Sequence, residues 1–591
     1  MPVFLFTVLP GKVIIGSRKG RELGMRIALC CINTKYVHSS LAPWYLAAAM
    51  EGAEGCEVSV IEGTINQSAE EIVQKILQAP CEVAAFCCYI WNIDRVRQVI
   101  RGLKARQPGL TVVLGGPEVT FRPQELLSQW PEVSYVLCGE GEESFPALMQ
   151  ALAQKRVPAE IPGLASRDET GAVSLVPARP LRTLPPSPYS EAYLSRLKGR
   201  IAYLETSRGC PFSCSFCLSG VKETVRFFEM EQAKANLVRL ANSGAKTIKL
   251  IDRTFNCHPG RAYALLSFIL AQSGRAFPGD VRFHFEVGAD LFRPEFLALL
   301  ATAPPGLIQI EAGLQSFCEK TLEAVDRKTD LAVLTENLRQ CIRPQNVHVH
   351  IDLIAGLPYE DYQTFASSFN QAFALRPHML QLGFLKLLHG SKLRRQAETR
   401  ADFGYRFSQD APYEVQQTRW LSPDDLAKLH EVEDALERLY NSGRFLRTIE
   451  YLLQATGWTP FALFEAFGGY AAARGTAGVA LDTYTQWLWD FFAGQKGVQA
   501  EHLRDCLVID RLSCDNTGRI PPLLRREDTR LKYAKAKARA KRPGAGKLGV
   551  ALLYQPFRIA VFDYDRRDVI TGRYAVEVCG DEEIEKRGRY A

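Results

Sequence analysis

The sequence has no apolar run long enough to span a bilayer, so it does not indicate a helical membrane protein. It also lacks GxxxxGKS or GxxxxGKT, and no GxGxxG follows its first expected strand, which leaves a nucleotide or flavin site without support. A net charge of +7 is modest for 591 residues and does not by itself indicate nucleic acid. A chain of this length is expected to form about three or four domains.

Cysteine is abundant, but its placement does not suggest a disulfide scaffold. The 16 cysteines are spread through the chain and include the adjacent pairs Cys30-Cys31 and Cys87-Cys88. Residues 1–24 are apolar first and basic afterwards, the reverse of a signal peptide. We therefore expect a reducing, cytoplasmic location. Because a clean strand begins next to Met25, residues 1–24 are expected to be a dispensable extension.

Three cysteines lie close together in the run Cys-Pro-Phe-Ser-Cys-Ser-Phe-Cys, as Cys210, Cys214 and Cys217. Three thiolates on one short loop can hold three corners of a cuboidal iron–sulfur cluster and leave the fourth iron open. Segment 201–206 reads as a buried strand, so the loop begins at a strand's C-terminal end, where barrel enzymes build their sites. The alternative is zinc, but structural zinc takes four ligands and no second cysteine pair follows.

Ahead of this loop, strand-like runs alternate with helical patterns. Strands are expected at 26–31, 58–61, 83–88, 111–114 and 136–138, with helices such as 68–77 and 93–106 between them. This alternation predicts an α/β fold with a doubly wound parallel sheet, in which ligands bind beyond the C-terminal strand ends. The candidate residues there are Asn33, Thr34, Tyr89, Gly115, Gly116, Gly139, Glu140 and Gly141. Adjacent glycines let the backbone approach a bulky group, which favours a flat cofactor.

The next part of the chain repeats the alternation after a proline-rich linker at 158–200. Strands are expected at 201–206, 247–251, 282–287, 307–311, 347–354 and 379–384. Polar side chains interrupt or follow them, namely Asp252, Glu286, Glu311, Gln315 and Asp352. A buried carboxylate without a partner is costly, so these side chains should meet a ligand or each other. For Asp252 and Glu311 a structural ion pair remains equally open.

The three-then-two cysteine spacing, with Phe216 before the third cysteine, resembles the signature of the radical S-adenosylmethionine (SAM) superfamily. The glycine-rich strand ends resemble the cobalamin-binding domain joined to many of these enzymes. That domain often carries Asp-x-His-x-x-Gly, whose histidine ligates cobalt, and this chain lacks the motif. Stretches 285–290, 313–316, 326–327 and 352–358 resemble the coproporphyrinogen-dehydrogenase-like branch.

This resemblance implies three cofactors: a [4Fe-4S] cluster on the three cysteines, SAM, and a cobalamin without a histidine ligand. It also implies that Glu286 and Asp352 hold the ribose of SAM. Gln315 would contact SAM, Arg327 would pair with its carboxylate, and Phe216 would lie beside adenine. The thiol of Cys257, just past a barrel strand, is a further candidate, as a hydrogen donor to a substrate radical.

The implied activity is methylation of an unactivated carbon in an unknown substrate, through reductive cleavage of SAM to a 5′-deoxyadenosyl radical. A low-potential electron donor such as flavodoxin or ferredoxin would be a partner. Two alternatives stay open. One is a radical SAM reaction other than methylation, with cobalamin as an electron carrier or absent. The other is RNA modification through the basic stretch 525–547, which is more readily interpreted as a solvated loop.

We therefore expect five segments. They are an extension (1–24), a cobalamin-binding Rossmann-like domain (25–157), a linker (158–200), a partial (β/α)6 radical SAM barrel (201–395) and a C-terminal domain (396–591). The last resembles an uncharacterised domain found in some cobalamin-binding radical SAM proteins. Its pattern predicts helices over about 402–494, one of them at 422–443, and a small sheet within 552–578.

Overall fold

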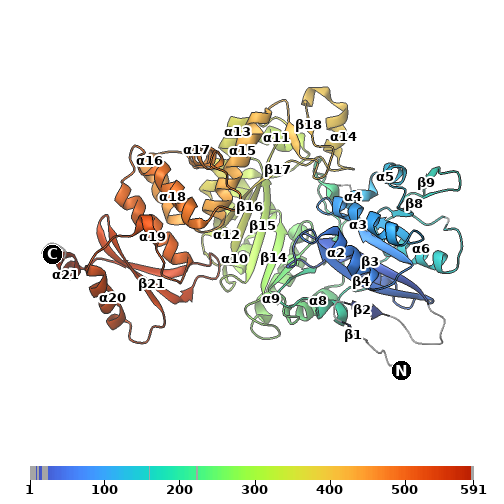
Figure 1. Ribbon diagram of the computed structural model, residues 1–591, viewed down its shortest axis with the longest axis horizontal. Coiled ribbons are helices and arrows are strands. Elements are labelled where there is room, and N and C mark those ends of the chain that lie inside the picture. Colours follow the sequence, from blue (N-terminus) through green and yellow to red (C-terminus); the bar gives the residue numbers. More distant parts are fainter. Residues whose placement is uncertain (1–7, 10–11, 16–23, 159, 221–223, 588–591) are drawn as a thin grey trace. The chain divides into compact units, whose positions relative to one another are not determined.

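The structure is a computed structural model that describes residues 8–9, 12–15, 24–158, 160–220 and 224–587 (Figure 1). It divides into two compact units. The first unit comprises residues 1–286, 386–401 and 406–415, and the second comprises 287–385, 402–405 and 416–591. Within the described ranges, no helix is both long and apolar enough to cross a membrane.

The first unit contains a nine-stranded sheet. Its strands are β1 (Val8–Leu9), β2 (Lys12–Ile15), β3 (Met25–Asn33), β4 (Cys56–Thr64), β5 (Val83–Cys87), β6 (Thr111–Gly115), β7 (Tyr135–Leu137), β8 (Leu164–Arg167) and β9 (Val173–Leu175). The central strands are parallel in the order β4-β3-β5-β6-β7. This is a doubly wound order whose switch point lies between β3 and β5, where such sheets bind ligands.

Helices pack on this sheet because their apolar residues recur at helical spacing. They are α1 (Ala42–Ala49), α2 (Ala69–Leu77), α3 (Ile93–Arg106), α4 (Pro117–Thr120), α5 (Pro123–Gln129) and α6 (Ser144–Ala153). Helix α2 starts at a capping box in which Ser68 and Glu71 satisfy each other's backbone amides. Helix α3, labelled in Figure 1, runs beside the strands of this sheet. It buries Val96, Val99 and Leu103 in the core. The predicted helix at 93–106 is confirmed to the residue.

Two segments differ from the sequence-based expectation. Strands β8 and β9 lie within the segment 158–200, for which we predict only a linker, and they extend the sheet in antiparallel fashion. At the other edge, β2 pairs with β4, so the described residues of the expected extension belong to the sheet. Runs of two to four residues are too short for a periodicity argument to find. Whether residues 1–24 are dispensable stays a prediction, and most of them lie outside the described residues.

The first unit continues into a second parallel sheet. Its strands β10 (Ile201–Leu204), β13 (Thr247–Leu250) and β14 (Arg282–Val287) pair in that order. A short antiparallel pair, β11 (Ser207–Arg208) with β12 (Arg226–Phe227), follows β10. The remaining helical segments of this unit are α7 (Glu191–Leu194), η1 (Leu218–Gly220), α8 (Met230–Ala241), η2 (Phe255–Cys257), α9 (Pro259–Gln272) and α14 (Lys392–Thr399).

The second unit begins with three further parallel strands, β15 (Ile308–Gln315), β16 (His348–Ala355) and β17 (Met379–Phe384). Their helical segments are η3 (Ala289–Leu291), α10 (Pro294–Ala301), α11 (Glu319–Ala324), α12 (Leu331–Ile342) and α13 (Tyr362–Ala374). All six strands expected after residue 200 are therefore present. Short elements η4 (Ala401–Phe403), β18 (Arg406–Phe407) and β19 (Val415–Gln417) lie where the chain alternates between the units.

The C-terminal part is helical and ends in a small antiparallel sheet. Its helical segments are α15 (Pro423–Leu436), η5 (Glu437–Asn441), α16 (Leu446–Thr456), α17 (Pro460–Ala472), α18 (Leu481–Phe492), α19 (Ala500–Cys514), η6 (Pro522–Leu524), α20 (Arg530–Lys541) and α21 (Glu582–Arg587). The sheet consists of β20 (Leu548–Tyr554), β21 (Phe557–Arg567) and β22 (Tyr574–Cys579). Both parts of the expected C-terminal pattern are confirmed.

One interpretation of this region is wrong. The basic stretch is not a solvated loop, because residues 530–541 form α20 and bury Ala534 and Ala538 against the small sheet (Figure 1). Part of its positive charge is also neutralised within the fold. Lys537 lies 2.8 Å from Asp581 and 2.9 Å from Glu583.

Candidate active site

The cysteine loop begins where β10 ends and is held by one buried carboxylate. Asp252 is 2% exposed and accepts hydrogen bonds from the amides of Thr206 (2.7 Å) and Ser207 (2.9 Å). These residues lead directly into β11, which pairs with β12, the next described strand after the three cysteines along the chain. Asp252 therefore fixes the strand-to-loop turn, and the structural interpretation of this residue is favoured.

The thiols lie on a compact turn. The Cys217 amide donates to the Cys214 carbonyl at 3.0 Å, and Cys214 is buried. The Cys210 sulfur lies 3.7 Å from the hydroxyl oxygen of Thr254. Burial raises the pKa of the Cys257 thiol, and the nearby groups Asp252 and Cys210 add to this effect. The Cys257 amide donates to the carbonyl of the same Thr254 at 3.1 Å, so Cys257 is linked directly to the residue that contacts Cys210.

The three thiols do not converge on one point in the described residues. Tetrahedral zinc holds its sulfur ligands about 3.8 Å apart, given Zn–S bonds of about 2.3 Å. Among the described residues, potential metal-ligand atoms that lie within 4.8 Å of one another are found on Glu311, His350 and Asp352. No cysteine belongs to such a group. The three thiols are therefore not gathered for one ion. Thiolates that each bind a different iron of a cluster do not need that convergence.

A cavity of about 440 Å³ lies beside this loop in the first unit. One wall comes from the C-terminal ends of β5, β6 and β7 and includes Tyr89, Gly115 and Gly116. A second part of the wall consists of Glu205, Ser207, Arg208 and Gly209, which lie just before Cys210 in the sequence. Further lining residues are Gly139, Glu140, Gly141, Glu142, Arg226 and Arg253. The glycine-rich loops and the cysteine loop therefore border the same space.

Glycine is required at one of these loops. Gly116 has φ +111° and ψ 172°, a conformation that is essentially restricted to glycine. A Cβ placed there would come within 2.5 Å of the Cys88 carbonyl oxygen. The backbone of the β6 end can thus form a wall without side chains, which fits the flat face of a large ring.

Arg208 joins the two walls electrostatically. Its guanidinium lies 3.0 Å from Glu140, 2.6 Å from Glu142 and 3.0 Å from Glu205, and the side chain is only 12% exposed. Burial acts to raise the pKa of Glu140, but hydrogen bonds from Arg226, the Leu181 amide and Arg208 outweigh it and leave the pKa lowered. Glu140 therefore stays ionised and binds the loop after β7 to the cysteine loop.

Not every predicted residue reaches this cavity. Asn33 is buried and donates to the His38 carbonyl at 3.2 Å, so it shapes its own loop, while Thr34 is half-buried. Neither is among the residues that line the cavity. Phe216 is half-buried on the cysteine loop. Tyr89, Gly115, Gly116, Gly139, Glu140 and Gly141 do line the cavity.

In the second unit, the end of β15 brings together Gln315, Arg327 and Gly313. Gln315 adopts φ +73°. A Cβ at Gly313 would come within 2.3 Å of the side-chain amide nitrogen of Gln315. The Arg327 guanidinium donates to the Gly313 carbonyl oxygen. Gln315 is 8% exposed, and within the described part of the chain no donor reaches its side-chain oxygen. A buried amide oxygen in this condition is suited to a ligand that donates a hydrogen bond.

Asp352 lies on the neighbouring strand β16, opposite Gly313 in the register. Its carboxylate is 2.9 Å from Nε2 of His350, and both cluster with Glu311. Three of the predicted SAM contacts, Gln315, Arg327 and Asp352, thus occupy one region of the β15–β16 pair. Glu286 belongs to the first unit, where Lys249 lies 3.0 Å from its carboxylate.

Sequence reasoning missed Arg208, Glu205, Glu142 and His350. Arg208 carried a detectable signal, since it stands two residues before the first cysteine and follows a strand. Its partners Glu140 and Glu142 are more than 60 residues away, so the ion pairs could not be inferred from spacing. His350 alternates along an apolar strand and resembled a core residue.

Three family models match successive parts of the chain. Residues 27–149 match the B12 binding domain, residues 204–372 match the radical SAM superfamily, and residues 401–547 match a protein of unknown function (DUF4080). The first two ranges fall on the doubly wound sheet and on the part that carries the cysteine loop. The third falls on the helical C-terminal part.

Two of the similar proteins are methyltransferases by name. A 2-(S-pantetheinyl)-carbapenam-3-carboxylate methyltransferase of Streptantibioticus cattleyicolor is 31% identical over 303 residues, or 48% of this chain and 44% of the relative. The cobalamin-dependent radical SAM methyltransferase TokK of Streptomyces tokunonensis is 27% identical over 455 residues, or 73% and 63%. Alignments with the first curated relatives thus cover about half to two-thirds of their lengths.

A solved structure has the same fold at low sequence identity. It is the radical SAM methyltransferase TsrM of Kitasatospora setae, with cobalamin and a [4Fe-4S] cluster bound. The TM-score is 0.54 at 19% identity, over 68% of this chain and 79% of that one. The matched ranges thus put a B12 binding domain ahead of a radical SAM domain along the chain, and the solved structure shares the fold.

Proposed function

We propose that this protein is a cobalamin-dependent radical SAM enzyme that methylates an unactivated carbon. One observation carries the proposal: the glycine-rich loops line the same cavity as Glu205, Ser207, Arg208 and Gly209, and Cys210 follows Gly209 directly. A flat cofactor in this cavity would lie next to a cluster held by Cys210, Cys214 and Cys217. The names of the two relatives support methyl transfer as the reaction.

The residues toward the cofactors follow from the site. The backbone of Gly115, Gly116, Gly139 and Gly141 would face cobalamin, and Tyr89 would pack at its edge. No histidine is among the described residues that line this cavity. We therefore propose that cobalamin is held without a histidine ligand to cobalt.

We further propose that SAM is held by Gln315, Arg327, Asp352, Glu286 and Phe216. The carboxylates of Glu286 and Asp352 would accept hydrogen bonds from the ribose hydroxyls. The Gln315 oxygen would accept a further hydrogen bond, and Arg327 would pair with the carboxylate of SAM. Cys257, beside the cysteine loop, is the candidate hydrogen donor.

When bound, the cofactors supply the electron that cleaves SAM and the methyl group that is transferred. The protein's own contribution is to orient them. Arg208 ties the loop after β7 to the cysteine loop, and Asp252 sets the turn from which the cysteines project. A low-potential electron donor and a reducing, cytoplasmic compartment complete the proposal, which fits an iron–sulfur protein with sixteen described cysteines and no disulfide among them.

Anaerobic reconstitution with iron, sulfide and hydroxocobalamin tests the proposal. About four irons and one cobalt per chain are expected after desalting, since the [4Fe-4S] cluster is cuboidal. Cys214→Ala should lose the iron. Cys56→Ala, which removes a half-buried thiol at the start of β4, is the matched control and should retain it. Iron without cobalt would leave the cluster but overturn the cobalamin part, and zinc in place of iron would overturn both.

A further inference from the structure

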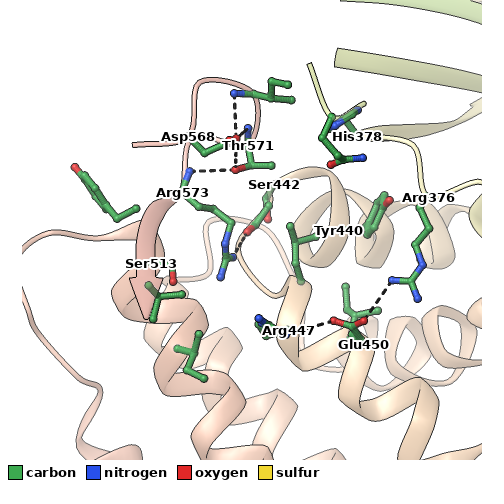
Figure 2. A pocket seen from close by; sticks show the side chains of 18 of the residues that line it. Arg376, His378, Tyr440, Ser442, Arg447, Glu450, Ser513, Asp568, Thr571 and Arg573 are labelled. Atoms are coloured by element: carbon green, nitrogen blue, oxygen red, sulfur yellow. Dashed lines mark hydrogen bonds and ion pairs between the residues drawn. The ribbon is translucent and has the colours of Figure 1, made fainter. Parts of the chain in front are cut away.

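The second unit contains a cavity of about 970 Å³ that no feature of the proposed reaction uses (Figure 2). Three parts of the chain form it: the segments before β16 and β17, helices α16 and α19, and the connection between β21 and β22. His348 and His378 mark the N-terminal ends of the two strands. Asp352 lies four residues farther along β16, or about 13 Å at about 3.3 Å per residue. The cavity is therefore at the opposite strand end from the proposed SAM contacts.

The walls of this cavity are held in place by hydrogen bonds. The Asn441 side chain accepts from the Leu380 amide at 3.0 Å and donates to the Leu380 carbonyl at 2.8 Å. Arg573 lies 2.7 Å from the buried Asp510 and also donates to the Gly443 carbonyl. Because these bonds connect strand, helix and hairpin, the cavity exists before any ligand arrives.

The lining carries an excess of positive charge. Its charged residues are Arg376, Arg447, Glu450, Asp565, Arg566, Arg567, Asp568 and Arg573. Figure 2 shows Glu450 between Arg376 and Arg447. Each guanidinium is 3.8 Å from the carboxylate, beyond hydrogen-bond distance. The Glu450 carboxylate thus lies near both guanidinium groups without forming a hydrogen bond to either.

Two further polar groups face the same space. Ser513 is 1% exposed, and its hydroxyl has no hydrogen-bond partner among the residues that the structure describes. It lies one helical turn beyond Asp510, which accepts from the Arg447 amide at 3.1 Å. In His378, Nδ1 accepts from the Val349 amide at 3.1 Å, so the neutral ring carries its proton on Nε2. Burial lowers the pKa of His378, which favours this neutral form, although Asp568 opposes the shift.

We propose that this cavity binds a small organic anion whose phosphate or carboxylate group is held by Arg376 and Arg447, with Ser513 as a hydroxyl donor. The cavity is at the upper end of the range for small-molecule sites, about 300–1,000 Å³, so the ligand is larger than a bare ion. Glu450 occupies the position between the arginines and competes with the ligand anion. Binding connects the radical SAM part to the C-terminal domain and therefore stabilises both.

Titration calorimetry of the reconstituted full chain, with pyrophosphate in one arm and citrate in the other, tests this proposal at constant ionic strength. Saturable binding at one site per chain is expected for at least one probe. Tighter binding of pyrophosphate assigns a phosphate ligand, and tighter binding of citrate assigns a carboxylate. Binding of neither probe would overturn the proposal.

Variants locate the binding. Arg447→Ala should weaken it at least tenfold, about 1.4 kcal/mol, and Ser513→Ala should weaken it less. Glu450→Gln should tighten it, because the competing carboxylate is removed. Arg339→Ala is the control: this arginine is 62% exposed and 3.8 Å from Glu336, much as Arg447 is 59% exposed and 3.8 Å from Glu450. Equal affinities of the Arg447 and Arg339 variants would refute the site.

The outcome is independent of the proposed catalysis. Cys214→Ala is expected to lose the cluster but to bind the probe with unchanged affinity. Failure of reconstitution with intact anion binding would overturn only the proposed function. The reverse result would overturn only the anion site.

Discussion

At the residue scale, Arg208 is the side chain on which the site depends most. It is surrounded by three carboxylates, and removing it would leave Glu140, Glu142 and Glu205 close together and without their shared cation. Breaking a buried ion pair by removing one partner typically costs about 3–5 kcal/mol. We expect Arg208→Gln to lower the free energy of unfolding by this amount in urea denaturation, and to reduce iron retention.

The matched control is Arg239→Gln. Arg239 is 41% exposed and pairs with Glu191 at 2.9 Å on the surface of the same unit. An exposed pair contributes about 1 kcal/mol or less. Similar losses in the two variants would mean that the carboxylates of the cavity do not depend on Arg208.

Glu360 makes stability depend on pH. Its carboxyl is fully buried and accepts from Ser316 at 2.6 Å and Ser368 at 2.9 Å. Burial raises its pKa from 4.5 to about 7, so between these values the folded state keeps a proton that the unfolded state has released. Stability should therefore fall as pH rises through this window, by about 3 kcal/mol at about 1.4 kcal/mol per pKa unit.

Urea unfolding at about pH 5 and about pH 8 measures this contribution. Glu360→Gln mimics the protonated form and should remove most of the decrease. Glu336→Gln changes an exposed carboxylate and should leave the decrease in place. If the Glu360 variant retained the full pH dependence, another group would have to be responsible for it.

At the element scale, a substitution at the end of β6 tests whether the glycine-rich loops form a wall against the cofactor. Gly116→Ala introduces a Cβ 2.5 Å from the Cys88 carbonyl oxygen. It also places alanine in a backbone conformation that this residue type avoids. Such strain costs about 1–3 kcal/mol. The expected result is destabilisation together with loss of cobalt after reconstitution, measured by metal analysis.

Gly109→Ala serves as the control, because a Cβ there would meet no atom within 4 Å. This variant should retain cobalt. Retention of cobalt by the Gly116 variant as well would show that the β6 end does not contact the cofactor.

Elements with a long, regular pattern of apolar residues could be predicted from the sequence. Elements that form only through contacts with residues far away in the chain could not. Helix α3 follows directly from the spacing of its apolar residues. Helix α20 was missed because lysine and arginine suggested solvation, although alanine, lysine and arginine are all good helix formers. The residues that it buries are Ala534 and Ala538, which lie four residues apart and pack against the small sheet.

The candidate site was predictable to the same degree. The cysteines and the glycines could be found because they are local motifs with a defined chemistry. The Arg208 network could not, since it joins residues that are far apart in sequence. The same holds for the anion cavity, to which residues from 345 to 576 contribute.

At the scale of the whole molecule, three matched regions follow one another along the chain. A B12-binding domain precedes the radical SAM domain, and a region of unknown function follows them. The first two share the 440 Å³ cavity, and the third contributes to the 970 Å³ cavity. This separation predicts that anion binding and cofactor loading can be lost independently.

The proposed function combines reductive cleavage of SAM at the cluster with cobalamin-dependent transfer of a methyl group. Its most direct test is the nucleoside analysis of the reconstituted full chain, incubated anaerobically with SAM and reductant, with and without hydroxocobalamin. We expect 5′-deoxyadenosine and S-adenosylhomocysteine with cobalamin, and neither product from Cys214→Ala. Formation of 5′-deoxyadenosine alone, unchanged by cobalamin, would contradict the account.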